Sequence, residues 1–271
     1  MDSKGYNATV IQKTLMTPNL MTLRVRPDEE VAGFTPGQYT VLGLKNSDTR
    51  IENSEPDANV YETETFIKRA YSISSASVEK EYLEFYISLV RSGQLTPRLF
   101  DLEQNSRLFL GSKIVGMFTL DSVPVEKDLL FIATGTGLAP YMSMIRSDLH
   151  LHKNRRFIVV HGAACSWDLG YRDELSLMDR FSENFTYIPT ITQPEDDLTW
   201  KGETKFIQDL LSSGVIEERS GAEIRPDRYD VFLCGNPKMV HLVTENLLEK
   251  GFKQHSRKDP GTIHTEEFWK E

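Results

Sequence analysis

The chain has only two cysteines, Cys165 and Cys234, among its 271 residues. Two thiols are too few for a disulfide framework, for a zinc site or for an iron–sulfur cluster held by four cysteines. The six histidines show no spacing typical of metal ligands. We therefore expect free thiols, no metal centre and a cytoplasmic location.

Long apolar runs and a surplus of positive charge are also missing. No stretch approaches the ~18 apolar residues of a membrane span, and Met1–Asn7 lacks the apolar centre of a secretory signal. Thirty-one lysines and arginines against 40 aspartates and glutamates give a net charge of −9. This balance argues against binding of nucleic acids or anionic membranes. The length and the 39% of apolar residues predict a globular protein of about two domains.

Short β-prone runs separated by turn residues fill the N-terminal part of the chain, which predicts an antiparallel barrel or sandwich. One brief helix is predicted from Thr96 to Leu102, with Thr96 as N-cap and Pro97 at its first position. The runs are Thr9–Ile11, Met21–Val25, Tyr39–Leu44, Arg69–Ile73 and Tyr82–Val90.

Lys45–Lys68 does not fit the barrel pattern, because it is acidic and has few apolar residues. This composition predicts a solvated loop or a protruding hairpin between two strands. The alternative is a device that contacts a partner.

From about Asp128 strands and helices alternate, which predicts a parallel sheet covered by helices. The expected architecture is therefore a β-barrel domain over residues 1–123 followed by an α/β domain over residues 124–271. The expected strands are Asp128–Ala133, Phe157–Val160, Thr186–Ile191 and Tyr229–Leu233, and the expected helices include Asp173–Phe181, Phe206–Leu211 and Lys238–Lys250.

Two glycine-rich turns follow strands of the α/β half. The first contains Gly135-Thr136-Gly137 and leads into a helix, so its backbone N–H groups are suited to a phosphate. Many such turns use glycine for geometry alone. A second turn, at Cys234-Gly235, repeats the design before another helix. We expect both turns to line one crevice at the carboxyl ends of the strands, where ligands bind α/β sheets.

The barrel half contributes Arg69-Ala70-Tyr71-Ser72 and Gly93-Gln94-Leu95-Thr96. The first motif alone fits a strand that alternates surface and core residues. Together, the two offer an arginine and a second helix start to a pyrophosphate. Tyr71 adds a flat face for a ring, and Ser72 adds a hydroxyl.

In this order the motifs resemble the ferredoxin–NADP reductase family, and most of all its bacterial ferredoxin/flavodoxin–NADP reductase branch. The resemblance covers nearly the whole chain, from Pro36–Tyr39 to an aromatic tail. It implies a FAD-dependent oxidoreductase that moves electrons between NAD(P)H and ferredoxin or flavodoxin. FAD would bind the barrel domain, and the pyridine nucleotide would bind the α/β domain.

The resemblance also implies roles for individual residues. Ser72, near the flavin N5, and Cys234, beside the nicotinamide C4, would be catalytic by setting the geometry of hydride transfer. Arg69 and the backbone amides of Leu95 and Thr96 would bind the FAD pyrophosphate, and Tyr71 would pack on the isoalloxazine. Phe268 and Trp269 would cover the flavin's other face and the adenine. The pyridine nucleotide would be held by Gly135, Thr136, Gly137 and Gly235.

The chain departs from the family where NADP-specific members hold the 2′-phosphate. Their arginines lie in His-x-x-Arg, Thr/Ser-Arg-Glu and Gly-Arg patterns, whereas this chain has Ala164, Gln193 and Glu203 at those places. Gln193 and Glu203 are suited to a ribose 2′-hydroxyl, which predicts that NADH is used at least comparably to NADPH. The alternative is that Lys201, Lys205 or Arg172 restores phosphate binding.

An acidic carrier protein needs a basic docking surface. A C-terminal run is the candidate, and Lys153, Arg155 and Arg156 form a second cluster; a solvated face is the alternative for both. His161 is expected to be structural and His264 to lie on the surface. The C-terminal run contains Lys250, Lys253, His255, Arg257 and Lys258.

Two other functions share these motifs. One is a free-standing NADH-dependent flavin reductase that acts on other acceptors, and the other is a flavin-binding module without turnover. An oxygenase reductase with its own iron–sulfur domain is excluded by the missing cysteines.

Overall fold

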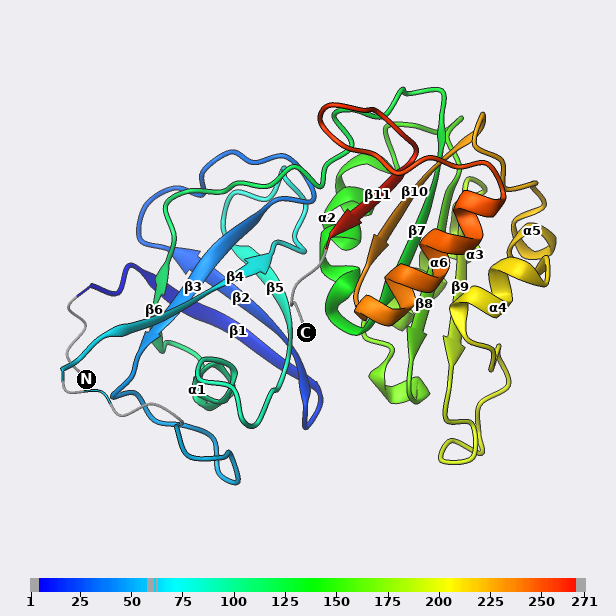
Figure 1. The fold of residues 1–271 in the computed structure, drawn as a ribbon. Helices are drawn as coiled ribbons and strands as arrows, with labels where there is room; N and C mark the ends of the chain where they lie inside the picture. The colour runs from blue at the N-terminus through cyan, green and yellow to red at the C-terminus, as the bar shows by residue number, and fades with distance from the viewer. Residues whose placement is uncertain (1–4, 58–60, 62, 267–271) are drawn as a thin grey trace. The chain divides into compact units, whose positions relative to one another are not determined.

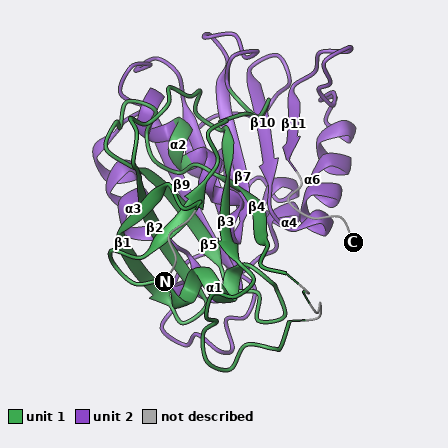
Figure 2. Ribbon diagram, turned by 90° about the vertical axis from the view of Figure 1, so that its left-hand side faces the viewer, with its two compact units in different colours: residues 1–119, 142–144 green, residues 120–141, 145–271 purple. Residues whose placement is uncertain are grey.

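The computed structural model describes residues 5–57, 61 and 63–266, and the chain forms two compact units (Figures 1 and 2). Unit 1 contains residues 1–119 and 142–144, and unit 2 contains residues 120–141 and 145–271. Among the described residues, no helix is long and apolar enough to cross a bilayer. The same residues contain no cluster of histidine, cysteine or carboxylate side chains suited to a metal ion.

Unit 1 is an antiparallel sheet of six strands in the order β4-β3-β6-β1-β2-β5 (Figure 1). Its edge strands meet at an isolated bridge between Ile73 and Phe85. The sheet therefore curves into a barrel that is not closed by a continuous ladder, and the predicted antiparallel barrel is confirmed. The strands are β1 (Ala8–Thr17), β2 (Leu20–Pro27), β3 (Tyr39–Lys45), β4 (Phe66–Ser72), β5 (Leu83–Ser88) and β6 (Arg107–Leu110).

The barrel core is built from alternate residues of these strands, such as Leu23, Val25 and Phe85, which are fully buried. The helix α1 (Thr96–Asp101) adds Leu99 and Phe100 to the same core. The prediction that Thr96 caps this helix is wrong, because Leu95 is the N-cap residue. The Thr96 hydroxyl instead exchanges two 3.0 Å hydrogen bonds with the main chain of Val90, so it closes the preceding turn.

Unit 2 has a parallel sheet of five strands in the order β11-β10-β7-β8-β9 (Figure 1), which confirms the predicted α/β architecture. Aliphatic residues on one sheet face pack against α4, α5 and α6 in one core. On the other face, the ring of Phe131 stacks on Tyr141 of α2 at 4.8 Å. The strands are β7 (Asp128–Thr134), β8 (Phe157–Ala163), β9 (Phe185–Ile191), β10 (Tyr229–Cys234) and β11 (Ile263–Glu266), and the helices are η1 (Gly135–Leu138), α2 (Ala139–Asp148), η2 (Ser166–Asp168), α3 (Arg172–Phe181), α4 (Ile207–Ser212), α5 (Val215–Ser220) and α6 (Pro237–Glu249).

Candidate functional site

The two glycine turns of unit 2 lie side by side, because β7 and β10 are neighbouring parallel strands with Ala133 opposite Cys234. The Thr134 hydroxyl accepts a 2.7 Å hydrogen bond from the Asn236 amide, which ties the two turns together. Asn236 in turn caps α6 through its side chain, which accepts from Lys238 and Met239. The strand pairing thus brings together the two turns that the sequence predicted to share a sheet edge.

Glycine is required at two positions of this turn pair. A Cβ at Gly137 would lie 2.3 Å from the Cys234 carbonyl oxygen, and a Cβ at Gly235 would lie 2.7 Å from the Thr134 carbonyl oxygen. Gly235 also has a φ of +132°, a conformation that L side chains rarely adopt. By contrast, a Cβ at Gly135 would meet nothing within 4 Å, so this part of the turn is open.

Cys234 ends β10 and is completely buried. Burial raises the pKa of its thiol well above the ordinary value, and the carboxylate of Glu266 adds to the effect. The thiol is therefore neutral and is not an activated nucleophile. Glu266 lies opposite Cys234 in the β10–β11 ladder. Glu266 was not predicted as a site residue, because its only signal in the sequence is its closeness to the aromatic tail.

The Arg-x-Tyr-Ser motif occupies the second half of β4 in unit 1. Arg69 is exposed, Tyr71 is half-buried and Ser72 is buried. Arg69 and Tyr71, two residues apart, share one face of the strand. Burial raises the pKa of the Tyr71 phenol, and Arg69 opposes this in part. Among the described residues, the buried Ser72 hydroxyl has no hydrogen-bond partner.

The turn before α1 connects to this motif. Arg69 donates a 3.3 Å hydrogen bond to the Gln94 side-chain oxygen. In the described part of the chain, no hydrogen bond uses the backbone amides of Gln94, Leu95 or Thr96 as donors, as is usual at the start of a helix. The structure therefore brings together an arginine and three amides of unit 1 that have no partner among the described residues.

Gln193 and Glu203 lie beyond the end of β9. Gln193 is exposed, and its backbone amide donates a 2.9 Å hydrogen bond to the Ala164 carbonyl. Glu203 is half-buried and is held through its main chain, which accepts from Ile191. Its carbonyl also accepts a 2.8 Å hydrogen bond from the Trp200 indole, whose ring lies 4.8 Å from the Arg172 guanidinium. Arg172 is thus linked to the main chain of Glu203 through Trp200.

Of the two histidines discussed in the sequence, His161 lies where it was expected and His264 does not. His161 is fully buried, and burial lowers its pKa to about 4, so a structural role fits. The expectation that His264 lies on the surface is wrong. It is 7% exposed and pairs with buried Asp230 at 2.7 Å, because β11 carries it into the sheet. The ring of Phe232 stacks on it at 4.3 Å.

The basic clusters are less available than their sequence indicated. Arg155 is buried, and it donates to the carbonyls of Lys127 and Pro124. Lys250 pairs with Glu217, and Lys253 pairs with Asp259. In the described residues, Arg257 and Lys258 are exposed and have no ion pair. The predicted roles of Phe268 and Trp269 fall outside the described residues.

Comparisons with known proteins match this arrangement. The family described as "Oxidoreductase NAD-binding domain" matches residues 131–245, which include both glycine turns. The flavodoxin/ferredoxin–NADP reductase of Buchnera aphidicola subsp. Baizongia pistaciae is 32% identical over 88% of this chain and 89% of its own. The protein of the same name in Escherichia coli is 33% identical over 78% of this chain and 77% of its own.

A solved structure gives the same fold. A ferredoxin NADP+ reductase from Neisseria gonorrhoeae, with bound FAD and NADP, has a TM-score of 0.82 and 24% identity, and the match covers 98% of this chain and 99% of that one. The fold and the paired glycine turns define a two-unit oxidoreductase. Given the identity to the two relatives, the chain belongs to the flavodoxin/ferredoxin–NADP reductase family, which confirms the resemblance found in the sequence.

Proposed function

We propose that this chain is a FAD-dependent oxidoreductase that moves electrons between NAD(P)H and a one-electron carrier, ferredoxin or flavodoxin. Its membership of the family, over 88% of its length, carries the proposal. The domain over residues 1–123 would hold FAD, and the domain over residues 124–271 would bind the nucleotide. Both cysteines are free thiols, which supports a cytoplasmic location.

The residues of unit 1 fit FAD. The buried Ser72 hydroxyl, which has no partner in the described part of the chain, can hydrogen-bond to the flavin ring, and the half-buried Tyr71 ring can pack on it. Arg69 and the backbone amides of Leu95 and Thr96, which bind no other described residue, suit a pyrophosphate. When bound, FAD supplies the conversion of a two-electron hydride into single electrons.

The residues of unit 2 suit the pyridine nucleotide. Gly135 lies in the open part of the first turn and is followed by the half-buried Thr136. The close packing of Gly137 against Cys234 and Gly235 sets the shape of the second turn. Hydride transfer needs two rings in contact and water excluded rather than a strong acid or base. A neutral, buried Cys234 thiol meets this need, because it positions a ring without adding charge.

The purified protein tests this proposal. It should be yellow, release FAD on denaturation and lose its flavin absorbance when NADH or NADPH is added without oxygen. A protein that carries flavin but does not bleach would be a binding module without turnover. A protein that neither retains nor takes up FAD would refute the proposal.

We also infer that discrimination toward NADPH is weak, so that NADH is used at least comparably. Glu203 stands where a family arginine would hold the 2′-phosphate, and each lost arginine–phosphate contact costs about 1.5–3 kcal/mol. In the described residues, the Glu203 carboxylate has no hydrogen bond or ion pair, so it is available to a ribose hydroxyl.

The ratio of kcat/KM for the two nucleotides tests this inference. A preference for NADPH of more than ~100-fold, or about 2.7 kcal/mol, would contradict it. The variant Arg172→Ala tests the alternative that Arg172 binds the 2′-phosphate. Arg172 is the residue to change because its guanidinium lies over the ring of Trp200, which is hydrogen-bonded to Glu203. If Arg172 binds the 2′-phosphate, the variant loses kcat/KM for NADPH by about 10-fold or more and keeps it for NADH.

For the carrier, the C-terminal basic run remains the proposed docking surface, with Arg257 and Lys258 as its available cations. Lys250 and Lys253 contribute less, because each already has a carboxylate partner. Replacing Arg257 and Lys258 by glutamine should raise the KM for the carrier and weaken its salt dependence without changing nucleotide oxidation by a small acceptor. Unchanged carrier kinetics would place the docking surface elsewhere.

A further inference from the structure

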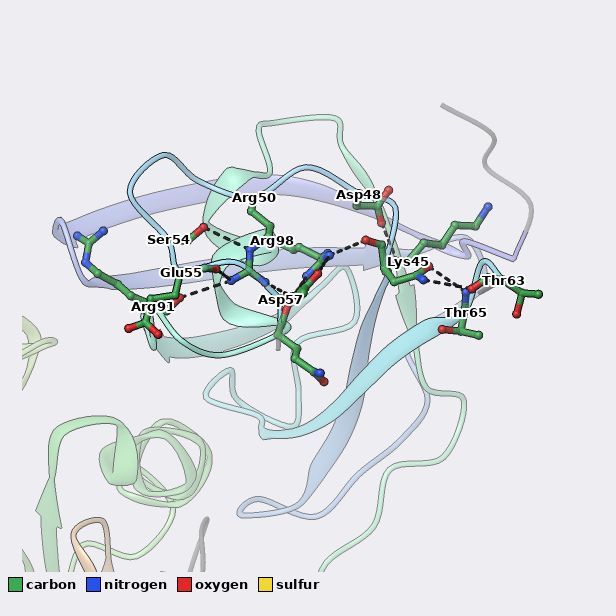
Figure 3. A network of polar contacts seen from close by, with 12 residues as sticks. Lys45, Asp48, Arg50, Ser54, Glu55, Asp57, Thr63, Thr65, Arg91 and Arg98 are labelled. Carbon is green, nitrogen blue, oxygen red and sulfur yellow. Dashed lines mark hydrogen bonds and ion pairs between the residues drawn. The ribbon is translucent and has the colours of Figure 1, made fainter. Parts of the chain in front are cut away.

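Residues 46–57, here called the strap, belong to the predicted loop between β3 and β4, and polar contacts anchor them to the rest of unit 1 (Figure 3). Their base is closed by Asn46, whose amide donates to the Thr65 carbonyl at 2.9 Å and whose side-chain oxygen accepts from the Thr65 amide at 3.0 Å. Glu52 and Glu55 are exposed, as expected, but the strap as a whole is anchored. The predicted solvated loop is therefore confirmed for residues 46–57, none of which is buried, but its anchoring was not expected.

The strap's strongest anchor is an ion pair between Asp57 and Arg98 of α1 (Figure 3). Arg98 is 2% exposed, and its Nη2 lies 2.5 Å from the Asp57 carboxylate. Arg50 approaches the same carboxylate at 2.5 Å. Hydrogen bonding to Arg98 lowers the pKa of Asp57, so its charge is retained at neutral pH. A buried guanidinium needs such a partner, since an unpaired buried charge is strongly destabilising.

Arg98 extends this anchor to the turn before α1. Its Nη1 donates to the Gln94 carbonyl at 2.6 Å, and its Nη2 donates to the Asn46 carbonyl at 2.5 Å. One planar side chain therefore holds the strap's first residue, the carboxylate at its other end and the Gln94 peptide. The fork geometry of arginine makes this arrangement specific, because lysine offers no planar set of donors.

Main-chain hydrogen bonds also hold the strap against the residues on either side of the 93–96 turn. The Ile51 amide donates to the Pro97 carbonyl and the Glu55 amide donates to the Arg91 carbonyl, each at 3.0 Å. The Arg91 guanidinium returns a 3.3 Å hydrogen bond to the Asn53 carbonyl. The strap thus contacts both the start and the end of the segment that contains residues 93–96.

That segment contains the unpartnered amides proposed above for the FAD pyrophosphate. Gln94 is the link: its carbonyl accepts from Arg98, and its side-chain oxygen accepts from Arg69. A continuous path of contacts therefore runs from Asp57 through Arg98 and Gln94 to Arg69. All of its members belong to unit 1.

We propose that the strap is a positioning element for the FAD diphosphate, in which Asp57 acts through Arg98 to hold the 93–96 turn in its binding shape. The inference rests on the proposed function, because it takes FAD as the ligand of that turn. Asp57 and Arg98 are positioning residues here. They preorganise the amides, so that binding does not have to order the turn.

Release of FAD from the holoenzyme tests the proposal. The variant Asp57→Asn removes the charge and keeps the size of the side chain. Its matched control is Glu52→Gln, which removes one charge from an exposed strap residue that has no bond or ion pair among the described residues. Each protein is diluted, free FAD is separated by ultrafiltration, and the Kd is obtained from the amount released.

We expect D57N to raise the Kd for FAD by about 10-fold, as for the loss of one charge-assisted contact. E52Q should stay within about 2-fold of the wild type, and kcat of D57N at saturating FAD should also stay within about 2-fold, because Tyr71 and Ser72 are untouched. Arg98→Lys should weaken FAD binding in the same direction as D57N, since it keeps the charge but loses the fork.

Two results would overturn the proposal. One is a D57N protein with a lowered melting temperature but the FAD affinity of the wild type, which would make the strap purely structural. The other is equal weakening in D57N and E52Q, which would indicate a general charge effect. If D57N does not fold, the Kd for FAD of R98K, which retains the cation, is compared with that of the wild type instead. An unchanged Kd in R98K would overturn the proposal. A wild-type protein that binds no FAD would instead refute the proposed function itself.

Discussion

Replacing Gly137 by alanine tests how closely the two glycine turns of unit 2 must pack. The new Cβ would lie 2.3 Å from the Cys234 carbonyl oxygen and 2.8 Å from the Gly235 amide nitrogen, whereas ordinary contacts begin at 3.4 Å. Both neighbours are main-chain atoms at the end of a buried strand. Because such packing cannot be compressed, the end of β10 has to move by about 1 Å.

This movement displaces Cys234, which we propose lies beside the nicotinamide ring. A misplacement of about 1 Å can cost on the order of 100-fold in rate. We therefore expect Gly137→Ala to slow hydride transfer by about 100-fold while its FAD content stays at the wild-type level, since the proposed flavin residues belong to unit 1. Anaerobic stopped-flow mixing with saturating NADH, followed by the loss of flavin absorbance, measures the rate.

Two other glycines serve as controls. Gly33→Ala adds a Cβ with nothing within 4 Å and at no positive φ, so stability and rate should be unchanged. Gly135 also has open space but a φ of +53°, so Gly135→Ala should cost about 1 kcal/mol in stability. A Gly137→Ala protein with the wild-type rate of hydride transfer would refute the packing argument.

Three further changes test individual residues. Arg69→Ala should weaken FAD retention by about 10- to 100-fold, because a charge-assisted bond to phosphate is worth about 1.5–3 kcal/mol; full flavin content after extensive dialysis would show that Arg69 has another role. Ser72→Ala and Cys234→Ala should slow hydride transfer more than they raise the Kd for the nucleotide, since both set geometry; equal losses would indicate uniform binding instead. Because burial lowers the pKa of His161 from 6.5 to about 4, the unfolded chain binds a proton that the folded chain excludes, and stability falls as the pH drops through this range. The free energy of unfolding should fall by about 2 kcal/mol between pH 7 and pH 5 because of His161. Urea unfolding measures this free energy, and it should fall more steeply with pH for the wild type than for His161→Asn. Identical pH dependences for the two proteins would show that His161 does not contribute.

The strands were predictable where β-branched and aromatic residues run together. Asp128–Ala133 and Tyr229–Leu233 each came within one residue of the observed β7 and β10. β6 and β11 were missed because each has only four residues and polar members. In β11, His264 pairs with Asp230 of the neighbouring strand, a contact that local pattern does not reveal.

The candidate site was predictable as motifs but not as contacts. The glycine turns could be found because close backbone approach demands glycine, yet the 2.3 Å approach of Gly137 to Cys234 depends on the pairing of β7 with β10. The anchoring of the strap could not be predicted for a similar reason. Asp57 and Arg98 are 41 residues apart, and an acidic composition gives no sign that one carboxylate neutralises a buried arginine.

Electron delivery to a carrier protein is the most direct test of the proposed function. In a double-mixing experiment without oxygen, the holoenzyme is first reduced by NADH and then mixed with an oxidised ferredoxin or flavodoxin. The proposed function predicts that the carrier is reduced as the flavin absorbance returns, and that FAD stays bound throughout. A reduced enzyme that passes electrons to free flavin or oxygen but not to either carrier would contradict it and would identify a flavin reductase instead.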